Sequence, residues 1–431
     1  MAYLNLHVIS FWRGFNCFSG PFPTTPRVVN SFCKLKTSAF THNSASLFKK
    51  GCGNFSTSVL SATSQYSSHT SSESECPTHQ ATCFDSVKSK ESSVDVDSSN
   101  GRVMLIDGTA IIYRAYYKLL AKLHHGHLSH ADGNGDWVLT IFSSLSLVVD
   151  VLEFIPSHVA VVFDHDGVPF GHSYVSSKEN VMAKGLNFRH TLYPAYKSNR
   201  PPTPDTIVQG LQYLKASIKA MSIKVIEVPG VEADDVIGTL AMRSVNAGFK
   251  VRVVSPDKDF FQILSPSLRL LRIAPRGFGM VSFGLDDFAK LYGSLKPSQF
   301  VDMISLVGDK SDNIPGVEGI GDVYALQLIT RFGTLEKLLE CVDQVKEERI
   351  REALRANADQ AILSKKLALL RSDLPSYMVP FATEDLTFKK PEDNGEKFTS
   401  LLTAISAYAE GFSADRIIRR TSHLWKKLEA R

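Results

Sequence analysis

The chain lacks the features that would place it in a membrane, in a disulfide-bonded scaffold or among strongly basic proteins. No uninterrupted apolar run approaches the roughly 18 to 20 residues that a membrane-spanning helix needs, so no membrane contact is expected. Of the 6 cysteines only Cys341 lies beyond residue 100, which excludes a disulfide framework for the folded part. A net charge of +4 over 431 residues does not by itself indicate nucleic-acid binding, so any basic surface must be local.

The first hundred residues lack the apolar periodicity that a folded core needs. Residues 1–72 contain no Asp or Glu, six Lys or Arg, and 21 Ser or Thr. This composition predicts an organellar transit peptide, and the alternative is a disordered tail without a targeting signal. Residues 73–100 contain six acids and two lysines and are interpreted as a disordered linker. The composition favours a plastid and leaves a mitochondrion, or both organelles, open.

Short β-branched runs after residue 100 predict an α/β fold over residues 101–296. Four of these runs read as buried parallel strands: Arg102–Asp107, His158–Asp164, Ile223–Val228 and Lys250–Ser255. Helical apolar spacing between them, as in Pro204–Met221, indicates alternating strands and helices. Residues 297–431 form a second, α-helical region, in which three helices are expected: Pro297–Leu306, Asp322–Phe332 and Leu335–Cys341.

Acidic residues follow the predicted strands or begin the predicted helices, where open α/β sheets bind ligands. Nine are placed in this way: Asp107, Asp164, Glu232, Asp234, Asp235, Asp257, Asp259, Asp309 and Asp312. Carboxylates gathered at one edge repel one another unless cations neutralise them. Oxygen ligands without His or Cys select Mg²⁺ or Mn²⁺. The pattern therefore predicts two divalent ions about 3.5 to 4 Å apart that assist in-line attack of water on a phosphodiester.

Each single acid has an ordinary alternative explanation, because Asp and Glu commonly cap helices or face solvent. The segment Val231–Val236 is the exception, since three carboxylates fall within four residues. Helical spacing puts Glu232 and Asp235 on one face, so part of this charge is expected to turn toward the sheet edge.

Five acidic motifs appear in order along the chain: Leu105–Thr109, Val162–Asp164, Glu232–Asp235, Ser255–Phe260 and Gly308–Gly316. Together they resemble the 5′-nuclease domain of bacterial DNA polymerase I and its phage flap-endonuclease relatives, over about residues 102–425. The resemblance implies a PIN-like parallel sheet with flanking helices and a helical arch, followed by a helix-3-turn-helix region that binds DNA. It also implies 5′-3′ exonuclease and 5′-flap endonuclease activity with two Mg²⁺, with all nine acids as metal ligands.

The resemblance assigns a basic stretch to the helical arch that admits the 5′ strand. Between residues 180 and 204 there are four Lys or Arg and no acid. We expect phosphate contacts from Arg189, Lys197 and Arg200, and stacking faces for unpaired bases from Tyr193 and Tyr196. Lys197 and Arg200 would also neutralise charge that develops on the scissile phosphate. The alternative is a basic surface loop with buried tyrosines.

A glycine loop before the helix at 322–332 is assigned by the resemblance to the DNA duplex backbone and to a monovalent cation such as K⁺. Its expected backbone contacts come from Gly316, Gly319 and Gly321. Lys310 lies beside this loop as a further phosphate contact. Tyr113 and Arg114, after the first strand, match a family position near the substrate, although aromatic residues on such a helix are more often part of a core.

Two departures from the family pattern affect the expected DNA contacts. Val323-Tyr324 stands where bacterial members usually have Lys-Thr, which removes one phosphate-binding charge. Duplex affinity is then lower, or Lys310 and Arg331 compensate. Gly167–Asn187 is an insertion rich in Gly and Ser, which favours a disordered surface loop over a longer threading gate.

The leading hypothesis is an organelle-targeted, metal-dependent nuclease that acts on DNA with 5′ ends, flaps or nicks in replication or repair. The chain ends without a polymerase segment, so we expect a monomer that works beside a separate polymerase and ligase. An RNA-directed PIN-like nuclease is the rival within the same class. A catalytically silent scaffold for branched DNA is the rival from another class, and the complete set of acids argues against it.

Overall fold

The computed structural model describes residues 101–430 except 125–132, 166–186, 274–278 and 410. The predicted transit peptide and linker at 1–100 lie outside the described residues, as does the insertion Gly167–Asn187 apart from Asn187. The described residues belong to one compact unit, which contains residues 97–431.

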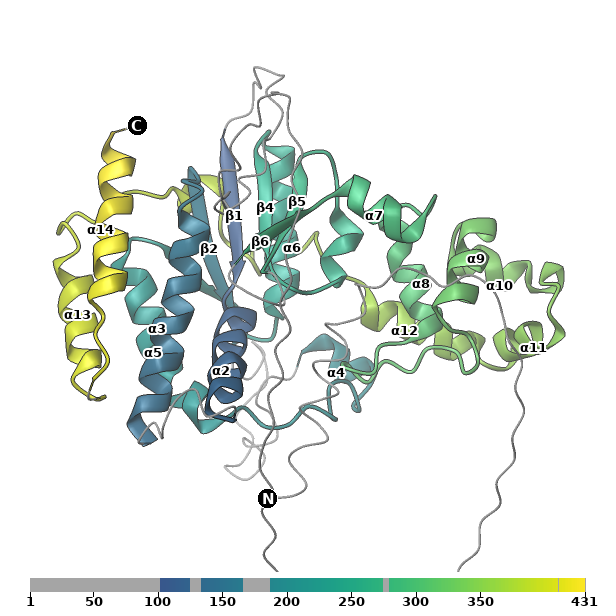
Figure 1. Ribbon diagram of the computed structural model, residues 1–431. Helices are drawn as coiled ribbons and strands as arrows, with labels where there is room; N and C mark the ends of the chain where they lie inside the picture. Colours follow the sequence, from purple (N-terminus) through teal and green to yellow (C-terminus); the bar gives the residue numbers. More distant parts are fainter. Residues whose placement is uncertain (1–100, 125–132, 166–186, 274–278, 410, 431) are drawn as a thin grey trace, which may run out of the picture. The chain divides into compact units, whose positions relative to one another are not determined.

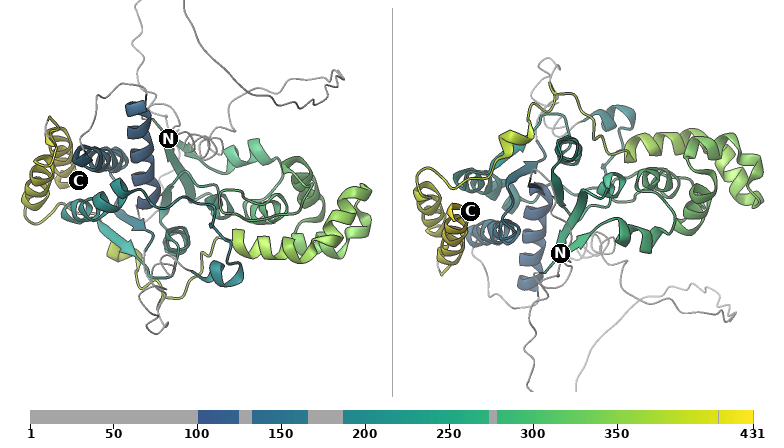
Figure 2. Two further views of the ribbon diagram at one scale, coloured as in Figure 1. Left: turned by 90° about the horizontal axis from the view of Figure 1, so that it is seen from below. Right: turned by 90° about the horizontal axis from the view of Figure 1, so that it is seen from above.

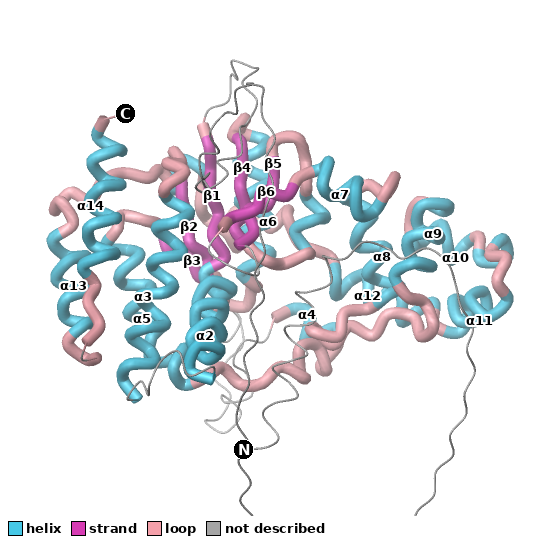
Figure 3. The backbone as a smooth tube through the Cα atoms, in the orientation of Figure 1, coloured by secondary structure: helices cyan, strands magenta, loops and turns pink. Residues whose placement is uncertain are grey.

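Six strands form one sheet in the order β3-β2-β1-β4-β5-β6 (Figure 3). The strands are β1 (Arg102–Asp107), β2 (His158–Phe163), β3 (Lys224–Glu227), β4 (Lys250–Val254), β5 (Leu268–Ile273) and β6 (Met280–Phe283). The first five pair in parallel, and β6 is antiparallel to β5. The four strands expected from the sequence are confirmed to within one residue at each end, whereas β5 and β6 were not predicted.

Helices cover both faces of the sheet (Figure 1). The first half of the chain contributes α2 (Gly108–His124), α3 (Gly133–Leu152), α4 (Phe188–Leu192), α5 (Asp205–Ala220) and α6 (Ala233–Asn246). Strand β1 is buried on both sides because its side chains alternate between two cores. Val103 and Leu105 belong to the core of α6, while Met104 and Ile106 belong to the core of α3 and α5.

Helix α3 is the most apolar helix in the described part of the chain by membrane criteria. Its window Gly135–Leu152 has a mean hydropathy of 1.5, which is high enough to cross a bilayer by length and composition. However, 72% of this window is buried inside the fold. Helix α3 buries its apolar side chains by packing on α2 and α5, as a core helix of a globular domain does.

A helical region follows the sheet. It contains α7 (Leu285–Tyr292), η2 (Pro297–Gln299), α8 (Phe300–Val307), α9 (Asp322–Phe332), α10 (Leu335–Glu340), η3 (Val342–Gln344), α11 (Glu348–Ala356) and α12 (Ala358–Ala368), where η denotes a 3-10 helix. One more 3-10 helix, η1 (Asp259–Ile263), lies earlier, between β4 and β5. The three helices expected here are confirmed, the first as η2 and α8 together. Helix α8 packs on α9 and α12, so the glycine loop is held between packed helices.

The last part of the chain returns to the sheet, which corrects the expectation of one helical region over 297–431. After η4 (Thr383–Leu386), helix α13 (Glu396–Ser406) packs against α5, and α14 (Asp415–Glu429) packs against α3. Phe398 and Trp425 are buried in the same core as β1. Figure 2 shows these yellow helices beside the blue and teal helices of the first half. The sequence did not reveal this return, because amphipathic spacing shows that a helix has an apolar face but not which element that face packs against.

Candidate active site

Acidic side chains meet at the carboxyl edge of the sheet. Asp107 ends β1, Asp164 follows β2, and Asp257 follows β4. Because these three strands are adjacent and parallel, their ends open at the same edge. Helix α6 begins at this edge, with Glu232 at its N-cap position and Asp234 in its first turn.

A chain of short hydrogen bonds fixes the acids on the β4 side. Asp107 accepts from the Ala110 N–H and from the Ser255 hydroxyl, each at 2.8 Å. The Ser255 oxygen accepts in turn from the Asp257 N–H at 3.2 Å. The Asp259 N–H then donates to Asp257 at 2.9 Å. The orientation of Asp107 is therefore linked through Ser255 to the next two acids.

A second chain fixes the acids on the β2 side. The Asp164 N–H donates to the Thr109 hydroxyl at 3.0 Å, which ties the end of β2 to the start of α2. One carboxylate oxygen of Asp164 accepts from the Ala233 N–H at 2.8 Å, at the N-terminus of α6. This is a favourable position for an anion, since the first N–H groups of a helix have no intrahelical partner. The contact sets Asp234, the next residue, beside the strand ends.

Burial and mutual repulsion oppose ionisation of the acids nearest the sheet. Burial, together with the charge of Asp164, raises the pKa of Asp107 to about 7. Burial also raises the pKa of Asp234 well above its usual range, and the charges of Asp257 and Asp107 raise it further. These four carboxylates therefore share one electrostatic environment with too little positive charge.

A second group of acids is centred on Asp257. Burial raises the pKa of Asp257, and the charges of Asp312 and Asp309 contribute to the rise. Burial, followed by the charge of Asp257, raises the pKa of Asp259. Asp257 thus belongs to both groups, which together span the carboxyl edge of the sheet and the loop after α8.

Residues 309–313, called here the acidic loop, carry the last two acids and are closed by glycine backbone. The Asp309 N–H donates to the Ile314 carbonyl at 3.0 Å, and the Ile314 N–H donates back at 2.7 Å. Gly308 and Gly316 flank this closure with φ of 77° and 65°. A Cβ on Gly308 would lie 2.6 Å from the Ile314 oxygen. The loop can close this tightly only because both flanking residues lack a side chain.

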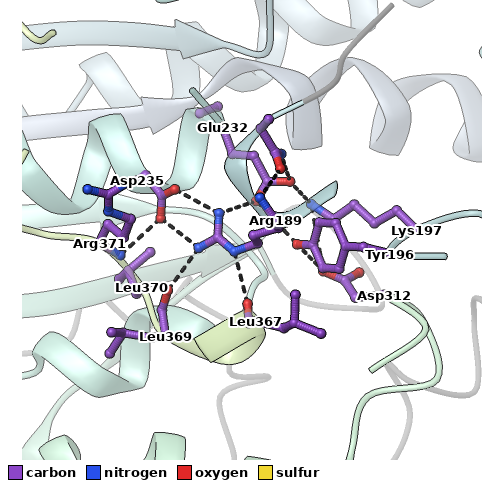
Figure 4. A network of polar contacts seen from close by, with 12 residues as sticks. Arg189, Tyr196, Lys197, Glu232, Asp235, Asp312, Leu367, Leu369, Leu370 and Arg371 are labelled. Atoms are coloured by element: carbon purple, nitrogen blue, oxygen red, sulfur yellow. Dashed lines mark hydrogen bonds and ion pairs between the residues drawn. The ribbon is translucent and has the colours of Figure 1, made fainter. Parts of the chain in front are cut away.

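The basic segment, residues 195–200, docks on the acidic loop (Figure 4). The Lys197 ammonium lies 2.6 Å from Glu232 and 3.7 Å from Asp312, and Arg200 pairs with Asp312. The Lys197 N–H donates to the Asp312 carbonyl at 2.9 Å. Both cations predicted to act on the phosphate therefore lie against carboxylates of the site, and their role toward a phosphate stays a prediction.

Backbone contacts strengthen this docking. The Asn199 side chain donates to the Lys310 carbonyl at 2.6 Å, and the Asn313 side chain donates to the Ala195 carbonyl at 2.6 Å. Lys197 itself has φ of 55°, a left-handed backbone that the surrounding contacts maintain. The described part of the expected arch is thus the short helix α4 followed by a turn-rich segment fixed to the acidic loop.

The structure corrects the role assigned to Arg189. Its side chain is only 4% exposed and forms ion pairs with Glu232 and Asp235. Burial by itself would lower the pKa of Arg189, but the hydrogen bond and charge of Asp235 and the charge of Glu232 raise it. A guanidinium enclosed in this way does not contact a DNA phosphate.

The structure also corrects Tyr196, which was expected to offer a stacking face. Its side chain is buried, 3% exposed. The hydroxyl lies 3.2 Å from Glu232 and 3.1 Å from Asp312 and donates to one of them at a time. Tyr196 therefore packs inside the site, which matches the alternative of a basic loop with a buried tyrosine. Tyr193 is half-buried against the core of α6, so the stacking role of Tyr193 stays a prediction.

Asp235 does not join the acid cluster, which corrects its assignment as a metal ligand. It is 1% exposed, and its two oxygens accept from Arg189 at 2.7 and 2.9 Å. The Arg371 N–H donates to Asp235 as well, at 3.0 Å. Glu232 and Asp235 do share a helix face, as their spacing predicted, but that face turns toward Arg189. Burial opposes ionisation of Glu232, yet the charges of Lys197 and Arg189 outweigh it and lower its pKa to about 2.

The remaining predicted DNA contacts lie near the surface except Gly316, whose N–H donates to the Ser364 hydroxyl at 3.1 Å, which corrects its assignment to the duplex backbone. Tyr113 is half-buried on α2 with its hydroxyl 3.2 Å from that of Thr203, and Arg114 beside it is half-buried. Lys310 is exposed in the acidic loop. In the glycine loop, Gly316 is buried in contact with the backbone of α8, while Gly319 and Gly321 are exposed before α9.

Val323, 68% exposed, and Tyr324, 43% exposed, occupy the first turn of α9 and face solvent. They therefore stand on an accessible surface beside the glycine loop. Their effect on duplex affinity stays a prediction.

Three polar residues of the site were missed by sequence reasoning. Ser255 and Thr109 link the acids as described, and the Asn187 side chain donates to Glu232 at 2.7 Å. Ser255 and Thr109 stood inside motifs already noted, so a polar residue beside a strand-end acid was an available signal. Asn187 gave only the ordinary signal of a helix N-cap before α4.

The donor set fits hard divalent cations. Within the described residues, no group of three or more His, Cys, Asp or Glu side chains is arranged to hold a metal ion as it stands. Like-charged carboxylates separate when no cation joins them, and Lys197 and Arg200 supply part of the missing charge. Asp107, Asp234 and Asp259 have raised pKa values and offer only oxygen donors, and Mg²⁺ and similar ions neutralise such acids.

Two family models match the chain one after the other, the first over most of the predicted domain 101–296 and the second over the first part of the predicted domain 297–431. Residues 102–293 match the 5′-3′ exonuclease, N-terminal resolvase-like domain. Residues 295–394 match the 5′-3′ exonuclease, C-terminal SAM fold. Helices α13 and α14 lie beyond the second match.

Curated relatives are similar over the same part of the chain. DNA polymerase I of Bacillus caldotenax is 34% identical over 288 residues, which cover 67% of this chain and 30% of that protein. Thermostable DNA polymerase I of Thermus thermophilus is 36% identical over 275 residues, which cover 64% of this chain and 29% of that protein. The chain thus spans about 30% of the length of these relatives. A solved structure, the T5 D15 protein co-crystallized with metal ions, aligns with a TM-score of 0.48 and 20% identity, over 72% of this chain and 100% of that one.

Proposed function

The chain belongs to the 5′-3′ exonuclease family, and we propose that it is a phosphodiester hydrolase that cleaves DNA from 5′ ends and at 5′ flaps. One observation carries this proposal. Both exonuclease models match the described fold, and four of the acids within the first match, Asp107, Asp164, Asp234 and Asp257, interact at the carboxyl edge of the sheet. A binding scaffold would have no use for buried, mutually repelling carboxylates, because they lower its stability.

Divalent ions, Mg²⁺ or Mn²⁺, are the cofactor that this acid cluster would hold. The seven candidate ligands are Asp107, Asp164, Asp234, Asp257, Asp259, Asp309 and Asp312, with Glu232 next to them through Lys197. When bound, two such ions would supply an activated water and neutralise the leaving oxygen of the phosphodiester. Ser255 and Thr109 orient the acids before the ions arrive. The Ser255 hydroxyl donates to Asp107, and the Thr109 hydroxyl accepts from the Asp164 N–H.

Lys197 and Arg200 are the residues proposed to act on the scissile phosphate. Each is paired with a carboxylate in the absence of DNA, so each is held close to the cluster. A phosphate that enters the site offers both cations a second anion at short range. We propose that they then stabilise the charge that develops on it during cleavage.

The exposed glycine loop before α9 is proposed to contact the duplex backbone. Gly319 and Gly321 are exposed there and carry no side chain, so a phosphate can approach their N–H groups. A monovalent cation such as K⁺ is proposed at the same loop. The exposed Val323 and Tyr324 are expected to give weaker duplex binding than a basic pair would.

The cellular role is proposed from composition. The acid-free residues 1–72 support an organellar transit peptide, and with it a place in plastid or mitochondrial DNA replication or repair. We propose a monomer that works with a separate polymerase and ligase. A fusion of residues 1–100 to a fluorescent protein tests targeting to an organelle, and uniform cytosolic fluorescence would contradict the transit peptide.

The activity is tested with the full chain and a 5′-labelled DNA flap beside a nicked duplex, in Mg²⁺ and in EDTA. We expect short 5′-labelled products in Mg²⁺ alone. Retained binding without cleavage would support the scaffold instead. An RNA flap of the same sequence tests the substrate class, and equal or faster cleavage of RNA would overturn the assignment to DNA.

A further inference from the structure

We propose that Arg189 is a positioning residue that connects the C-terminal helical region to Lys197, and that it makes no contact with DNA. The inference rests on the proposed nuclease function. It concerns a residue whose basic character and place in the sequence favoured a phosphate contact.

All five N–H groups of the Arg189 guanidinium are used inside the protein (Figure 4). Nε donates to the Leu367 carbonyl at 2.9 Å. One terminal nitrogen donates to Glu232 at 2.9 Å and to Asp235 at 2.7 Å. The other donates to Asp235 at 2.9 Å and to the Leu369 carbonyl at 2.8 Å. No donor is left for a phosphate, and the side chain is almost completely buried.

These contacts join three parts of the chain that are far apart in sequence. Arg189 lies on α4, its carboxylate partners are at the start of α6, and its carbonyl partners are at the end of α12. The last carbonyls of a helix have no intrahelical donor and carry the negative end of its dipole. A guanidinium is well suited to them, so Arg189 caps α12 while it neutralises Asp235.

The same contacts determine where the Lys197 ammonium lies. One oxygen of Glu232 accepts from Arg189, and the other accepts from Lys197 at 2.6 Å and from Asn187 at 2.7 Å. Glu232 is therefore held from one side by Arg189 and positions Lys197 on its other side. If Arg189 moves, Glu232 loses its charged partner on that side and keeps only Asn187 and Tyr196, so the position of Lys197 is less tightly held.

Asp235 completes the arrangement as the counter-ion of Arg189. It is held by the bidentate pair and by the Arg371 N–H at 3.0 Å, which belongs to the segment just after α12. Asp235 thus acts on Lys197 through Arg189 and Glu232. It has no place among the acids that would hold metal ions.

The test compares three variants of the full chain: Arg189→Lys, Asp235→Asn and, as a matched control, Lys310→Gln. Arg189→Lys keeps the positive charge but cannot reproduce the five-donor fork. We expect single-turnover cleavage of the DNA flap in saturating Mg²⁺ to fall about 10- to 100-fold, because small displacements of a catalytic group cost that much. Asp235→Asn should give a similar loss that higher Mg²⁺ does not restore.

Binding measured in Ca²⁺ over a range of KCl separates positioning from phosphate contact. Each phosphate contact contributes about 0.9 to the slope of log affinity against log salt. Arg189→Lys would retain the charge at this position, so Arg189→Met is measured beside it. For both Arg189 variants we expect the wild-type slope. For Lys310→Gln we expect the magnitude of the slope to be smaller by about 0.9. A slope reduced by Arg189→Met to the same extent as by Lys310→Gln would overturn the proposal.

Hydrogen exchange tests the positioning without any cleavage. The Lys197 N–H is bonded to the Asp312 carbonyl, so the basic segment should exchange slowly in the wild type. We expect Arg189→Lys and Asp235→Asn to accelerate exchange over residues 195–200 more than over β1. Unchanged exchange there would refute the proposal even if the wild type proved inactive. A wild type that does not cleave, with the expected exchange pattern, would refute only the proposed function.

Discussion

Replacing Gly316 by alanine should displace the acidic loop and reduce both stability and cleavage. Gly316 has φ of 65°, and a Cβ there would lie 2.6 Å from the Val307 carbonyl carbon and against the backbone nitrogen of Gly308. A left-handed backbone costs a residue with a side chain about 1–2 kcal/mol. Overpacking against backbone atoms adds about 1–3 kcal/mol. The free energy of unfolding should therefore fall by about 2–5 kcal/mol.

Gly333→Ala is the matched control for this prediction. Gly333 ends α9 with φ of 90°, but a Cβ at this position meets nothing within 4 Å. It should lose only the conformational part, about 1–3 kcal/mol, because φ of 90° with ψ of -58° is a sparsely populated backbone region. Urea denaturation of both variants isolates the steric part as the difference between them. Equal losses would refute the argument that the close approach of Gly308 and Gly316 shapes the loop.

The same pair of variants links the loop to activity. The strained loop carries Asp309 and Asp312, so Gly316→Ala should slow flap cleavage by about 100-fold when these acids shift by an ångström. Gly333→Ala should cleave at close to the wild-type rate, because nothing near the site moves. Normal cleavage by a destabilised Gly316→Ala variant would show that the acids tolerate a displaced loop.

Three further predictions concern the acids and Lys197. Asp257→Asn should slow cleavage by about 100-fold or more, because this acid belongs to both acidic groups. Its affinity for the flap in Ca²⁺ should stay within a few-fold of the wild-type affinity, and rapid cleavage would remove Asp257 from the metal site. Lys197→Ala should slow single-turnover cleavage by about 100- to 1,000-fold with a smaller effect on binding, and a pure loss of affinity would reduce Lys197 to a phosphate contact. Asp234→Asn should raise the melting temperature in EDTA by a few degrees, because it removes a buried carboxylate that Asp257 and Asp107 repel. The same variant should not cleave in Mg²⁺, and a lower melting temperature would contradict the repulsion argument.

Features that depend on neighbours in sequence were predictable. The strand Arg102–Asp107 and the helix Asp322–Phe332 have the predicted bounds, since apolar runs and helical spacing are local properties. The acids at strand ends followed from the same pattern, because adjacent parallel strands must open at one edge. The short strands β5 and β6 were missed because Leu268–Ile273 has two arginines at an irregular spacing and Met280–Phe283 is only 4 residues long.

Features that depend on distant partners were not predictable. Arg189 and Lys197 are both basic residues in one stretch, yet the first is enclosed and the second lies at the edge of the cluster. The bond from Arg189 to Leu367 crosses 178 residues of sequence, and no local pattern encodes it. Tyr196 was misassigned for the same reason, since burial of its ring depends on the acidic loop more than a hundred residues away.

The sequence by itself determined the fold class through local periodicity and the candidate acids through the chemistry of residue types. The family followed from the resemblance of five acidic motifs in order along the chain. The tertiary structure decided which charges are free to act. Asp235 and Arg189 neutralise each other in a buried pair, whereas Asp107, Asp234 and Asp257 form no ion pair with a Lys or Arg of the described residues. The physical reason is that the role of an ionisable side chain depends on its burial and on the charges within a few ångströms of it, which only the folded chain brings together.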